Sequence, residues 1–338
     1  MHTGDNDMRY KLDAKDKAIL YELDKNARQS YSKIGKKLRL SKEVVKYRID
    51  RMIESGLIVR FHTVINYFKL GIVKYKLYLK LTNVNRKKLE EMGQYFKNHK
   101  KTEWVVTCTG KWDMIIGFLV HNINELDEEI QDISNRFAQY IHDKAVTATL
   151  YLGHHVREFL GRSEGKHKLK VVYHTTADKR EEVDKIDIEI LKILTNNARI
   201  STTEIARMLN LTPRIVQYRI KQLEKKQIIL AYKVHLDPRV MGNIFCKALM
   251  YLKSVTKERL DEFVTYCSSL PHAVWPQRVI GTWDFELDFE IESYDKFQDI
   301  MLELKEKFSD MIKDYDFIIV SKEFKLDFFP GAYPTFRA

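Results

Sequence analysis

The chain of 338 residues carries 58 Lys and Arg against 47 Asp and Glu, which gives a net charge of +11. The polar segment Met1–Tyr10 does not resemble a signal peptide, and no apolar run approaches the ~20 residues that span a bilayer. We therefore expect a cytoplasmic protein with no membrane partner. The positive surplus favours a polyanion such as double-stranded DNA.

A segment of the chain occurs twice, with a constant offset of 171 residues. Between residues 12–58 and 183–229, 17 of 47 aligned positions are identical. The repeated motifs of the first copy are Asp13-x-x-Asp16, Asn26-Ala27-Arg28, Tyr47-Arg48-Ile49 and Gly110-x-Trp112-Asp113. The repeat predicts two copies of one module, each with a helical part and an α+β part.

Apolar residues at helical spacing predict a first helix over residues 13–25 and a second helix shortly after it. Ser41 is placed to cap a third helix that runs to about Glu54. In the second copy, Thr212 caps the same helix and Pro213 occupies its first position. Three short helices with a tight turn between the last two indicate a helix-turn-helix domain.

The third helix of each copy has an apolar face and a polar face. The polar face carries Lys, Arg and Gln donors suited to base edges and phosphates in the major groove. We predict DNA contacts by Ser41, Lys42, Lys46, Tyr47, Arg48, Thr212, Arg214, Gln217, Tyr218, Arg219 and Lys221. The plain alternative is a solvated charged face. Arg48 and Arg219 border the buried face, where an internal ion pair with Asp13, Asp184 or a neighbour is an equally good interpretation.

The second part of each module alternates strands and helices. The pattern of the first copy predicts strands at 73–81, 104–109, 114–120 and 146–152, and helices at 86–98 and 123–140. The order βαββαβ recurs in the second copy and is that of a ferredoxin-like sheet. Two helices cover one face of such a sheet. Because its other face also needs cover, we predict that the two sheets of one chain pair as a pseudo-dimer.

The second copy contains Asn197-Ala198-Arg199-Ile200-Ser201, Leu211-Thr212-x-x-x-Val216 and Leu236-Asp237-Pro238. Over about 12–160 and 183–325, the chain resembles the leucine-responsive regulatory protein/AsnC family of feast/famine transcription regulators. The resemblance implies a winged helix-turn-helix domain followed by a regulatory domain that dimerises through its sheet. Most members have one module per chain, whereas this chain is a tandem.

The predicted fold class is therefore α+β, with two repeats of a winged helix-turn-helix domain and a ferredoxin-like βαββαβ domain. The predicted boundaries are 1–66 and 67–160 for the first module, 161–182 for a linker, and 183–238 and 239–338 for the second module. Within the linker, Lys168–Tyr173 could form an extra strand. The aromatic tail from Phe328 to Phe336 could dock on a sheet or on a partner chain.

The resemblance also implies that a small effector, often an amino acid, binds near one loop of each regulatory domain. These loops correspond to Gly110, Trp112 and Asp113 in the first copy and to Gly281, Trp283 and Asp284 in the second. The Asp side chains would accept hydrogen bonds from an ammonium group, and the Trp rings would form a wall. Trp104 and Trp275 are expected near the same interface. The alternative is a plain hairpin turn with Gly at positive φ.

Three functions remain open from the sequence. The first is a DNA-binding transcription regulator that responds to an effector and assembles into further homo-oligomers. The second is an enzyme, because siroheme decarboxylases resemble the same family and keep its helix-turn-helix. His121, Tyr140 and His142 are available for such chemistry, but no acid/base pair recurs in both copies, so we predict no catalytic residue. The third is an architectural DNA-coating protein. The basic helical parts favour the first and third.

The cysteines and histidines give no indication of a cofactor. Cys108, Cys246 and Cys267 fall where the other copy has apolar residues, so we expect buried free thiols in a reducing compartment. No Cys and His pair has the spacing of metal ligands. We therefore predict neither a metal site nor a cofactor.

Overall fold

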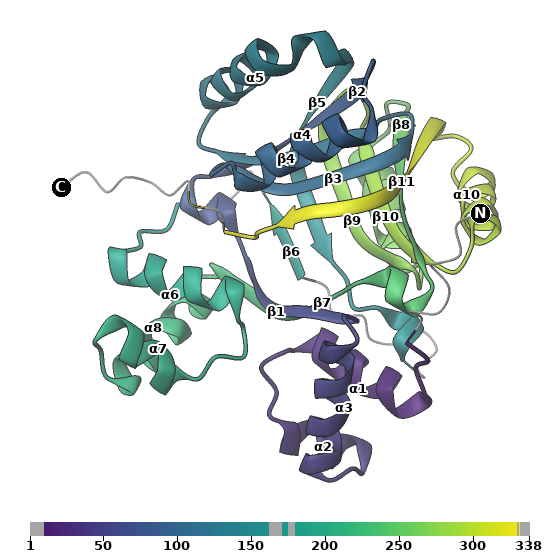
Figure 1. Cartoon of the computed structure of the whole chain (residues 1–338). Helices are drawn as coiled ribbons and strands as arrows, with labels where there is room; N and C mark the ends of the chain where they lie inside the picture. Colours follow the sequence, from purple (N-terminus) through teal and green to yellow (C-terminus); the bar gives the residue numbers. More distant parts are fainter. Residues whose placement is uncertain (1–9, 162–170, 175–179, 330, 332–338) are drawn as a thin grey trace.

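The computed structural model describes residues 10–161, 171–174, 180–329 and 331. Two small helical domains project from one end of a large β-structure, and a two-stranded ribbon joins them to it (Figure 1). The order of elements in the first module returns in the second. The predicted α+β fold of two helix-turn-helix and ferredoxin-like repeats is confirmed.

Each helical domain consists of three capped helices. They are α1 (Ala14–Lys25), α2 (Tyr31–Leu38) and α3 (Lys42–Glu54) in the first module, and α6 (Lys185–Asn196), α7 (Thr202–Leu209) and α8 (Pro213–Lys225) in the second. The side chains of Asp13, Ser30 and Ser41 each accept a hydrogen bond from a backbone N–H three residues later. These bonds satisfy donors that a helix start leaves unpaired, which is why each helix begins there.

The strand after each helical domain links the two modules. β1 (Ile58–Ile65) and β7 (Ile229–Leu236) pair antiparallel and form the ribbon. Helix α1 packs on β7, and helix α6 packs on β1. Each helical domain therefore rests on the strand of the other module, which holds the two domains in one arrangement.

The two regulatory domains have matching elements. The first contains β2 (Val73–Leu81), α4 (Arg86–Asn98), β3 (Thr102–Gly110), β4 (Met114–Val120), α5 (Ile123–Phe137) and β5 (Ile141–His154). The second contains β8 (Ile244–Leu252), α9 (Lys257–Cys267), β9 (Ala273–Gly281), β10 (Phe285–Ile291), α10 (Tyr294–Lys307) and β11 (Ile312–Leu326). Short 3-10 turns are η1 (Tyr67–Leu70), η2 (Ala138–Tyr140), η3 (Glu158–Leu160) and η4 (Pro238–Met241).

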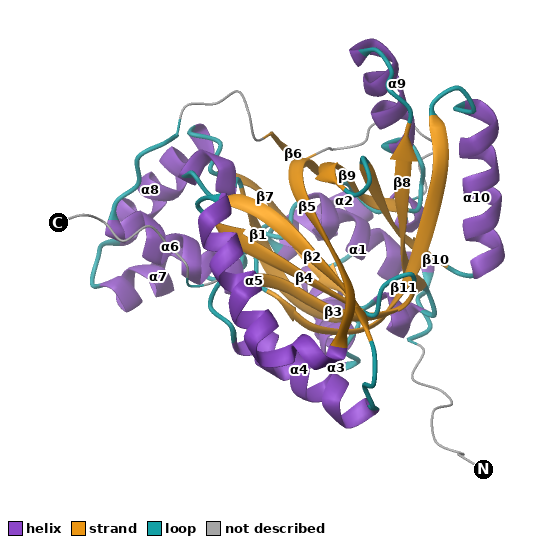
Figure 2. Cartoon of the chain, turned by 90° about the horizontal axis from the view of Figure 1, so that it is seen from above, coloured by secondary structure: helices purple, strands orange, loops and turns teal. Residues whose placement is uncertain are grey.

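The two sheets join at both edges. Their strand orders are β3-β4-β2-β5 and β9-β10-β8-β11, as in a ferredoxin-like fold. β5 pairs with β9, and β11 pairs with β3, so the strands of both domains close into one ring. The helices α4 and α5 lie outside one half of the ring, and α9 and α10 lie outside the other (Figure 2). The predicted pairing of the two sheets is confirmed, and the closed ring leaves few unpaired edges.

Apolar side chains fill both sides of the ring. Outside it, Phe96 of α4 and Phe137 of α5 pack onto the first half of the sheet, and Phe263 of α9 and Phe297 of α10 pack onto the second. Inside it, an aromatic and aliphatic cluster contains Tyr78, Trp112 and Trp283. The three cysteines are buried and free, as predicted. None of the helices that the structure describes has the length and apolar character needed to cross a bilayer.

The linker contributes one strand beside β5, and the start of the tail packs against the ribbon. β6 (Val171–His174) pairs with the end of β5, which confirms the extra strand over residues 171–173, whereas residues 168–170 lie outside the described part. Phe328 and Phe329 are buried. The ring of Phe328 stacks on His62 of β1 with centroids 4.1 Å apart. The tail beyond residue 331 lies outside the described residues.

Candidate nucleic-acid interface and interior cavity

Both third helices bury their apolar face and expose the polar one. In α3, Val45, Ile49 and Met52 are fully buried, and Tyr47 is 62% exposed. In α8, the buried residues are Val216, Ile220 and Leu223, and Tyr218 is also 62% exposed. The predicted contact residues on the polar faces are exposed as well: Lys42, Lys46, Arg214, Gln217 and Lys221. The structure therefore presents two polar helix faces to solvent, one from each module.

Ser41 and Thr212 act as helix caps. The Ser41 hydroxyl accepts a hydrogen bond from Val44 N at 3.2 Å, and the Thr212 hydroxyl accepts one from Ile215 N at 3.3 Å. A cap fixes where the helix begins and leaves backbone N–H groups of the first turn exposed. Their predicted role in DNA binding stays a prediction, and the structure gives them a positioning role.

Arg48 and Arg219 form internal ion pairs, which was one of the two roles that the sequence allowed for them. Arg48 Nη1 donates to Asp13 Oδ2 and Asp16 Oδ1, both at 2.7 Å. Arg219 Nη1 makes the same bonds to Asp184 at 2.7 Å and Asp187 at 2.9 Å. Each Arg thus ties the third helix of its domain to the first. This explains why the repeated Asp pair and the repeated Arg occur together.

The repeated Asn-Ala-Arg motif holds the two helical domains together. Arg28 Nη1 donates to the Ala198 carbonyl at 2.6 Å, and Arg199 Nη1 donates to the carbonyls of Ala27 and Gln29. Each of the two alanines also donates its backbone N–H to the ribbon strand of the other module. The sequence showed that the motif is repeated. It did not show that each Arg bonds to backbone carbonyls of the other module, about 170 residues away in the chain.

A basic groove of about 420 Å³ lies between the helical domains. Arg28 and Lys42 line it from the first module, and Arg199 and Ser201 line it from the second. The starts of α2 and α7 border the same groove at Ser30 and Ser201. Because helix N-termini and guanidinium groups both favour anions, this groove has the chemical character of an anion-binding surface.

The Gly-x-Trp-Asp loops are closed turns at the junction of the two sheets. Asp113 Oδ2 accepts a hydrogen bond from Leu81 N, and Asp284 Oδ2 accepts one from Leu252 N, both at 2.8 Å. Gly110 has φ +120°, and a Cβ there would collide with the carbonyl oxygen of Phe317 on the adjoining strand. Glycine is therefore required because a strand of the other module passes so close.

The tryptophans of these loops face the interior of the ring. Trp112 and Trp283 are 2% and 1% exposed, and their ring centroids lie 6.2 Å apart. Trp104 belongs to the same buried cluster as these two, as expected, and both Trp104 and Trp275 line an interior cavity, where each contacts Phe245. The hairpin-turn interpretation accounts for the loop geometry, since the aspartates are bonded to backbone and the indoles are packed. An effector at these loops stays an untested prediction.

Buried charges lie beside the aromatic cluster inside the ring. Lys76 and Lys247 occupy equivalent positions of the two modules, and both are fully buried. Lys247 Nζ lies 2.9 Å from Glu286 and 2.7 Å from Asp288, and these two carboxylates raise its pKa. Desolvation opposes the charged form, so each of these groups depends on its partners.

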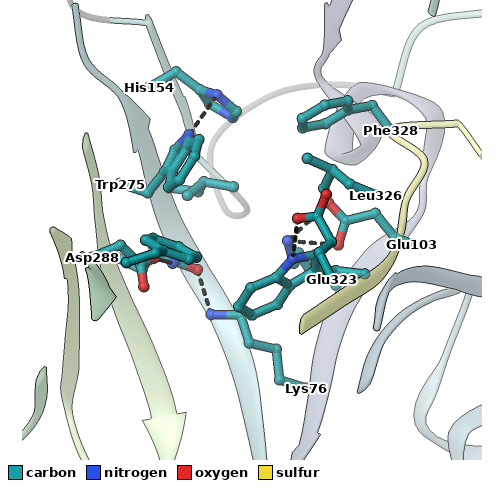
Figure 3. Close-up of a pocket in the computed structure, with 13 residues that line it drawn as sticks. Lys76, Glu103, His154, Trp275, Asp288, Glu323, Leu326 and Phe328 are labelled. Carbon is teal, nitrogen blue, oxygen red and sulfur yellow. Dashed lines mark hydrogen bonds and ion pairs between the residues drawn. The ribbon is translucent and has the colours of Figure 1, made fainter. Parts of the chain in front are cut away.

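An interior cavity of about 50 Å³ lies next to this network (Figure 3). None of His121, Tyr140 and His142, the residues considered for an enzyme, lines it. The buried imidazoles near it are those of His62, His154 and His235 instead. Sequence reasoning missed these three because none of them recurs in the other copy. Across the described residues, no cluster of His, Cys, Asp and Glu has a metal-binding arrangement.

Two exposed third helices on a shared ribbon, each in a capped three-helix domain, define the class of this protein as a tandem winged helix-turn-helix protein. Residues 12–59 match the winged helix-turn-helix DNA-binding model, and residues 183–224 match the AsnC-type helix-turn-helix domain. The chain belongs to the Lrp/AsnC family of transcription regulators.

Relatives with one module per chain support the family assignment by sequence, and one solved tandem structure shares the fold. An HTH-type transcriptional regulator of Mycobacterium tuberculosis is 33% identical over 123 residues, which cover 36% of this chain and 82% of the relative. LrpC of Bacillus subtilis is 29% identical over 120 residues, 35% of this chain and 81% of its own. The solved siroheme decarboxylase NirDL matches 93% of this chain and 92% of its own, with a TM-score of 0.61 and 12% identity. That similarity shows the shared tandem fold.

Proposed function

We propose that this protein is a transcription regulator that binds double-stranded DNA with both third helices of one chain. The observation that carries the proposal is the pair of exposed polar helix faces whose domains are locked together through Arg28, Arg199 and the ribbon. In a regulator with one module per chain, two chains must associate to present two such helices. Here one chain presents both.

The charges of the interface support DNA as the partner. Lys42, Lys46, Arg214 and Lys221 lie on the exposed faces, and the groove between the domains adds Arg28 and Arg199. Each phosphate that a cation neutralises releases counterions, which contributes a slope of about −0.9 to log affinity against log salt. Strongly salt-dependent binding is therefore expected. Response to a small molecule, a cytoplasmic location and further homo-oligomers belong to the same proposal.

We propose that the protein is not an enzyme of the siroheme decarboxylase type, although it shares that fold. The interior cavity of about 50 Å³ is far below the ~300–1,000 Å³ of sites that enclose drug-sized ligands, and a tetrapyrrole is at least that large. Polar groups beside the cavity, such as Lys76 and Asp288, are already paired with protein atoms. An absorbance titration with iron-uroporphyrin III checks this point, and a saturable Soret shift would favour the enzyme.

Fluorescence anisotropy with DNA selected from a random pool tests the regulator. Lys46→Ala and Gln217→Ala should each weaken specific binding by about 1–3 kcal/mol if the side chain reads a base edge. The control is Lys88→Ala, which removes one positive charge from α4, outside the helical domains. Equal affinities for the wild type, both interface variants and the control would refute the proposed interface.

A further inference from the structure

A groove lies where the ring meets the ribbon. It has a volume of about 190 Å³. It is lined by His235, Asp237 and Arg239 from the ribbon side and by Phe245, Lys322 and Glu323 from the ring. Its two cations are already paired, Arg239 with Asp237 and Lys322 with Glu90. The interior cavity of about 50 Å³ has Phe245 and Glu323 in its wall as well (Figure 3). The groove and the cavity therefore adjoin at these two side chains, and the groove opens the site to solvent.

Aromatic rings form the wall of the cavity. The ring of Phe245 lies edge-to-face with Trp104 at 6.3 Å and with Trp275 at 5.6 Å between centroids. Figure 3 shows Trp275 on one side of the cavity and Phe328 and Glu323 on the other. Aromatic walls next to a carboxylate are typical of sites that bind organic cations, because the ring faces carry partial negative charge.

Glu323 is the carboxylate of this wall that has no cationic partner among the described residues. Its Oε2 accepts a hydrogen bond from Trp104 Nε1 at 3.1 Å, and its Oε1 lies 3.4 Å from His235 Nε2. Burial, aided by Arg60 and Arg157, lowers the pKa of His235 to about 3, so the imidazole is neutral. It contributes a polar contact and no charge.

The other carboxylates that line the cavity are already neutralised. Lys74 Nζ lies 2.7 Å from Glu103, and Lys247 Nζ lies 2.7 Å from Asp288. Among the residues that the structure describes, no Lys or Arg nitrogen lies within ion-pair distance of Glu323. The side chain of Glu323 is 30% exposed, so a ligand can approach it from the groove.

We propose that this site binds a small molecule with a primary ammonium group, which pairs with Glu323 beside the rings of Trp104 and Phe245. The site is built from both parts of the molecule, since Glu323 and Phe245 belong to the ring and His235 belongs to the ribbon. Both helical domains pack on the ribbon. Occupancy therefore changes how the ribbon is held against the ring and shifts the two third helices together. This regulatory half of the inference rests on the proposed function.

The site has a pH signature that a purely structural carboxyl lacks. Burial and, to a smaller extent, Asp237 raise the pKa of Glu323 to about 7, against the lowering effects of Trp104, Arg60 and Arg239. A cationic ligand pairs with the ionised carboxylate and must displace the proton at lower pH. Its affinity should be level above pH 7 and should fall by about tenfold per pH unit below it.

Calorimetric titration of the full chain without DNA tests the site. The probes are ethylammonium, L-alanine and propionate, which compare an amine, an amino acid and an anion of similar size. We expect saturable binding of ethylammonium and none of propionate. Binding of L-alanine that also depends on Glu323 would support the proposal and identify amino acids as the source of the ammonium group. No saturable binding by either ammonium compound would overturn it.

Glu323→Gln should weaken ammonium binding at least tenfold and remove the pH dependence. The matched control is Glu189→Gln, which changes a half-exposed carboxylate on α6. Unchanged affinity in Glu323→Gln would overturn the proposal. If that variant does not fold, as judged by circular dichroism, Phe245→Leu replaces it, with an expected severalfold loss. An unchanged affinity in this second variant counts against the site equally.

The ligand site and its coupling to DNA binding can be refuted independently of each other. Ligand binding is measured without DNA, so its absence overturns the site and leaves the proposed regulator intact. DNA titrations without ligand and with ligand at a hundredfold excess over its Kd test the coupling. Ligand binding with an unchanged DNA affinity would refute the coupling. Ligand binding without any DNA binding would refute the proposed function alone.

Discussion

The two modules of this chain share the residues that hold the fold and differ in the residues that face a partner or the interior. The Arg48 and Asp13 pair of the first module returns as Arg219 and Asp184, with nearly the same bond lengths. The exposed face of α3 returns only in part, since Tyr218 matches Tyr47 but Gln217 stands at the position of Lys46. The residues that form the ion pairs within each helical domain are therefore repeated, whereas most of the exposed polar positions of the third helices differ.

The interior of the ring diverges as well. Glu286 and Asp288 of the second module correspond to Ile115 and Gly117 of the first, and the lysines beside them bind these carboxylates. In a symmetric dimer, every interior charge would appear twice around the axis. Covalent fusion removes this constraint, because each half can carry residues that complement the other. The two modules are thus one unit with unlike halves.

The largest loss of stability should come from removing a buried cation that only one module has. Arg157, whose counterpart is Phe328, is fully buried and pairs with Asp24 of α1 at 2.9 Å and Glu290 of β10 at 2.7 Å. Arg157→Met takes the guanidinium from two buried carboxylates and leaves Asp24 with only Lys233, at 3.3 Å, so it should lower the free energy of unfolding by about 3–5 kcal/mol. Urea denaturation measures this loss.

Arg239→Met is the control for that experiment. Arg239 pairs with Asp237 at 2.7 Å, but its side chain is 59% exposed, and such pairs contribute about 0–1 kcal/mol. Equal losses in the two variants would show that the Arg157 network does not tie the helical domain to the ring.

A smaller effect is expected from His235, whose counterpart in the first module is Val64. Burial lowers its pKa to about 3 from an unfolded value near 6.5. Between these values the unfolded chain binds more protons, so stability falls as pH drops through the window. Relative to the wild type, His235→Gln should reduce this slope by about 1.4 kcal/mol per pH unit.

Denaturation of both proteins at pH 7, 6 and 5 gives the comparison. Val64→Thr, at the equivalent position of the first module, controls for a polar change under the ribbon. Parallel stability curves for the wild type and His235→Gln would mean that His235 is not held neutral in the folded state.

The differing helix faces predict unlike DNA half-sites. Selection from random DNA should give an asymmetric site, and the exchange Lys46→Gln with Gln217→Lys should favour the site in the opposite orientation by about 1–3 kcal/mol. The single exchanges serve as controls, because each changes one face. Selection of a perfect palindrome by the wild type would contradict the asymmetry.

The smallest effect is expected where the modules agree. Arg48→Gln and Arg219→Gln each remove a partly exposed ion pair within one helical domain and should cost at most about 1 kcal/mol, by similar amounts. DNA affinity should change no more than in Lys88→Ala. A larger loss of affinity in either Arg variant would identify that side chain as a DNA contact.

Local patterns predicted the elements because their signals are local. The strand at 73–81, the helix at 86–98 and the strand at 114–120 have the bounds that the structure shows. Ser41 and Thr212 cap the helices that their positions indicated. Periodicity and capping depend on neighbours within a few residues, which the sequence contains directly.

The candidate sites were predicted less completely. The exposed faces of α3 and α8 followed from helical spacing, but the choice between DNA contact and ion pair for Arg48 did not. The glycine and tryptophan of each loop were visible as a motif, yet a hairpin and an effector site use the same residue types. The groove beside Glu323 left no sequence signal, because Leu152 stands at its equivalent position.

The sequence by itself determined that this chain is a tandem of two helix-turn-helix and α+β modules, since spacing, caps and a constant offset suffice for that. Only the tertiary structure decided that the edges of the two sheets close into one ring and that Arg28 and Arg199 reach across to the other module. Only it decided that Glu323 faces a cavity without a cationic partner. These outcomes depend on groups that lie far apart in the chain, and their energies are set by burial and contact in the folded state.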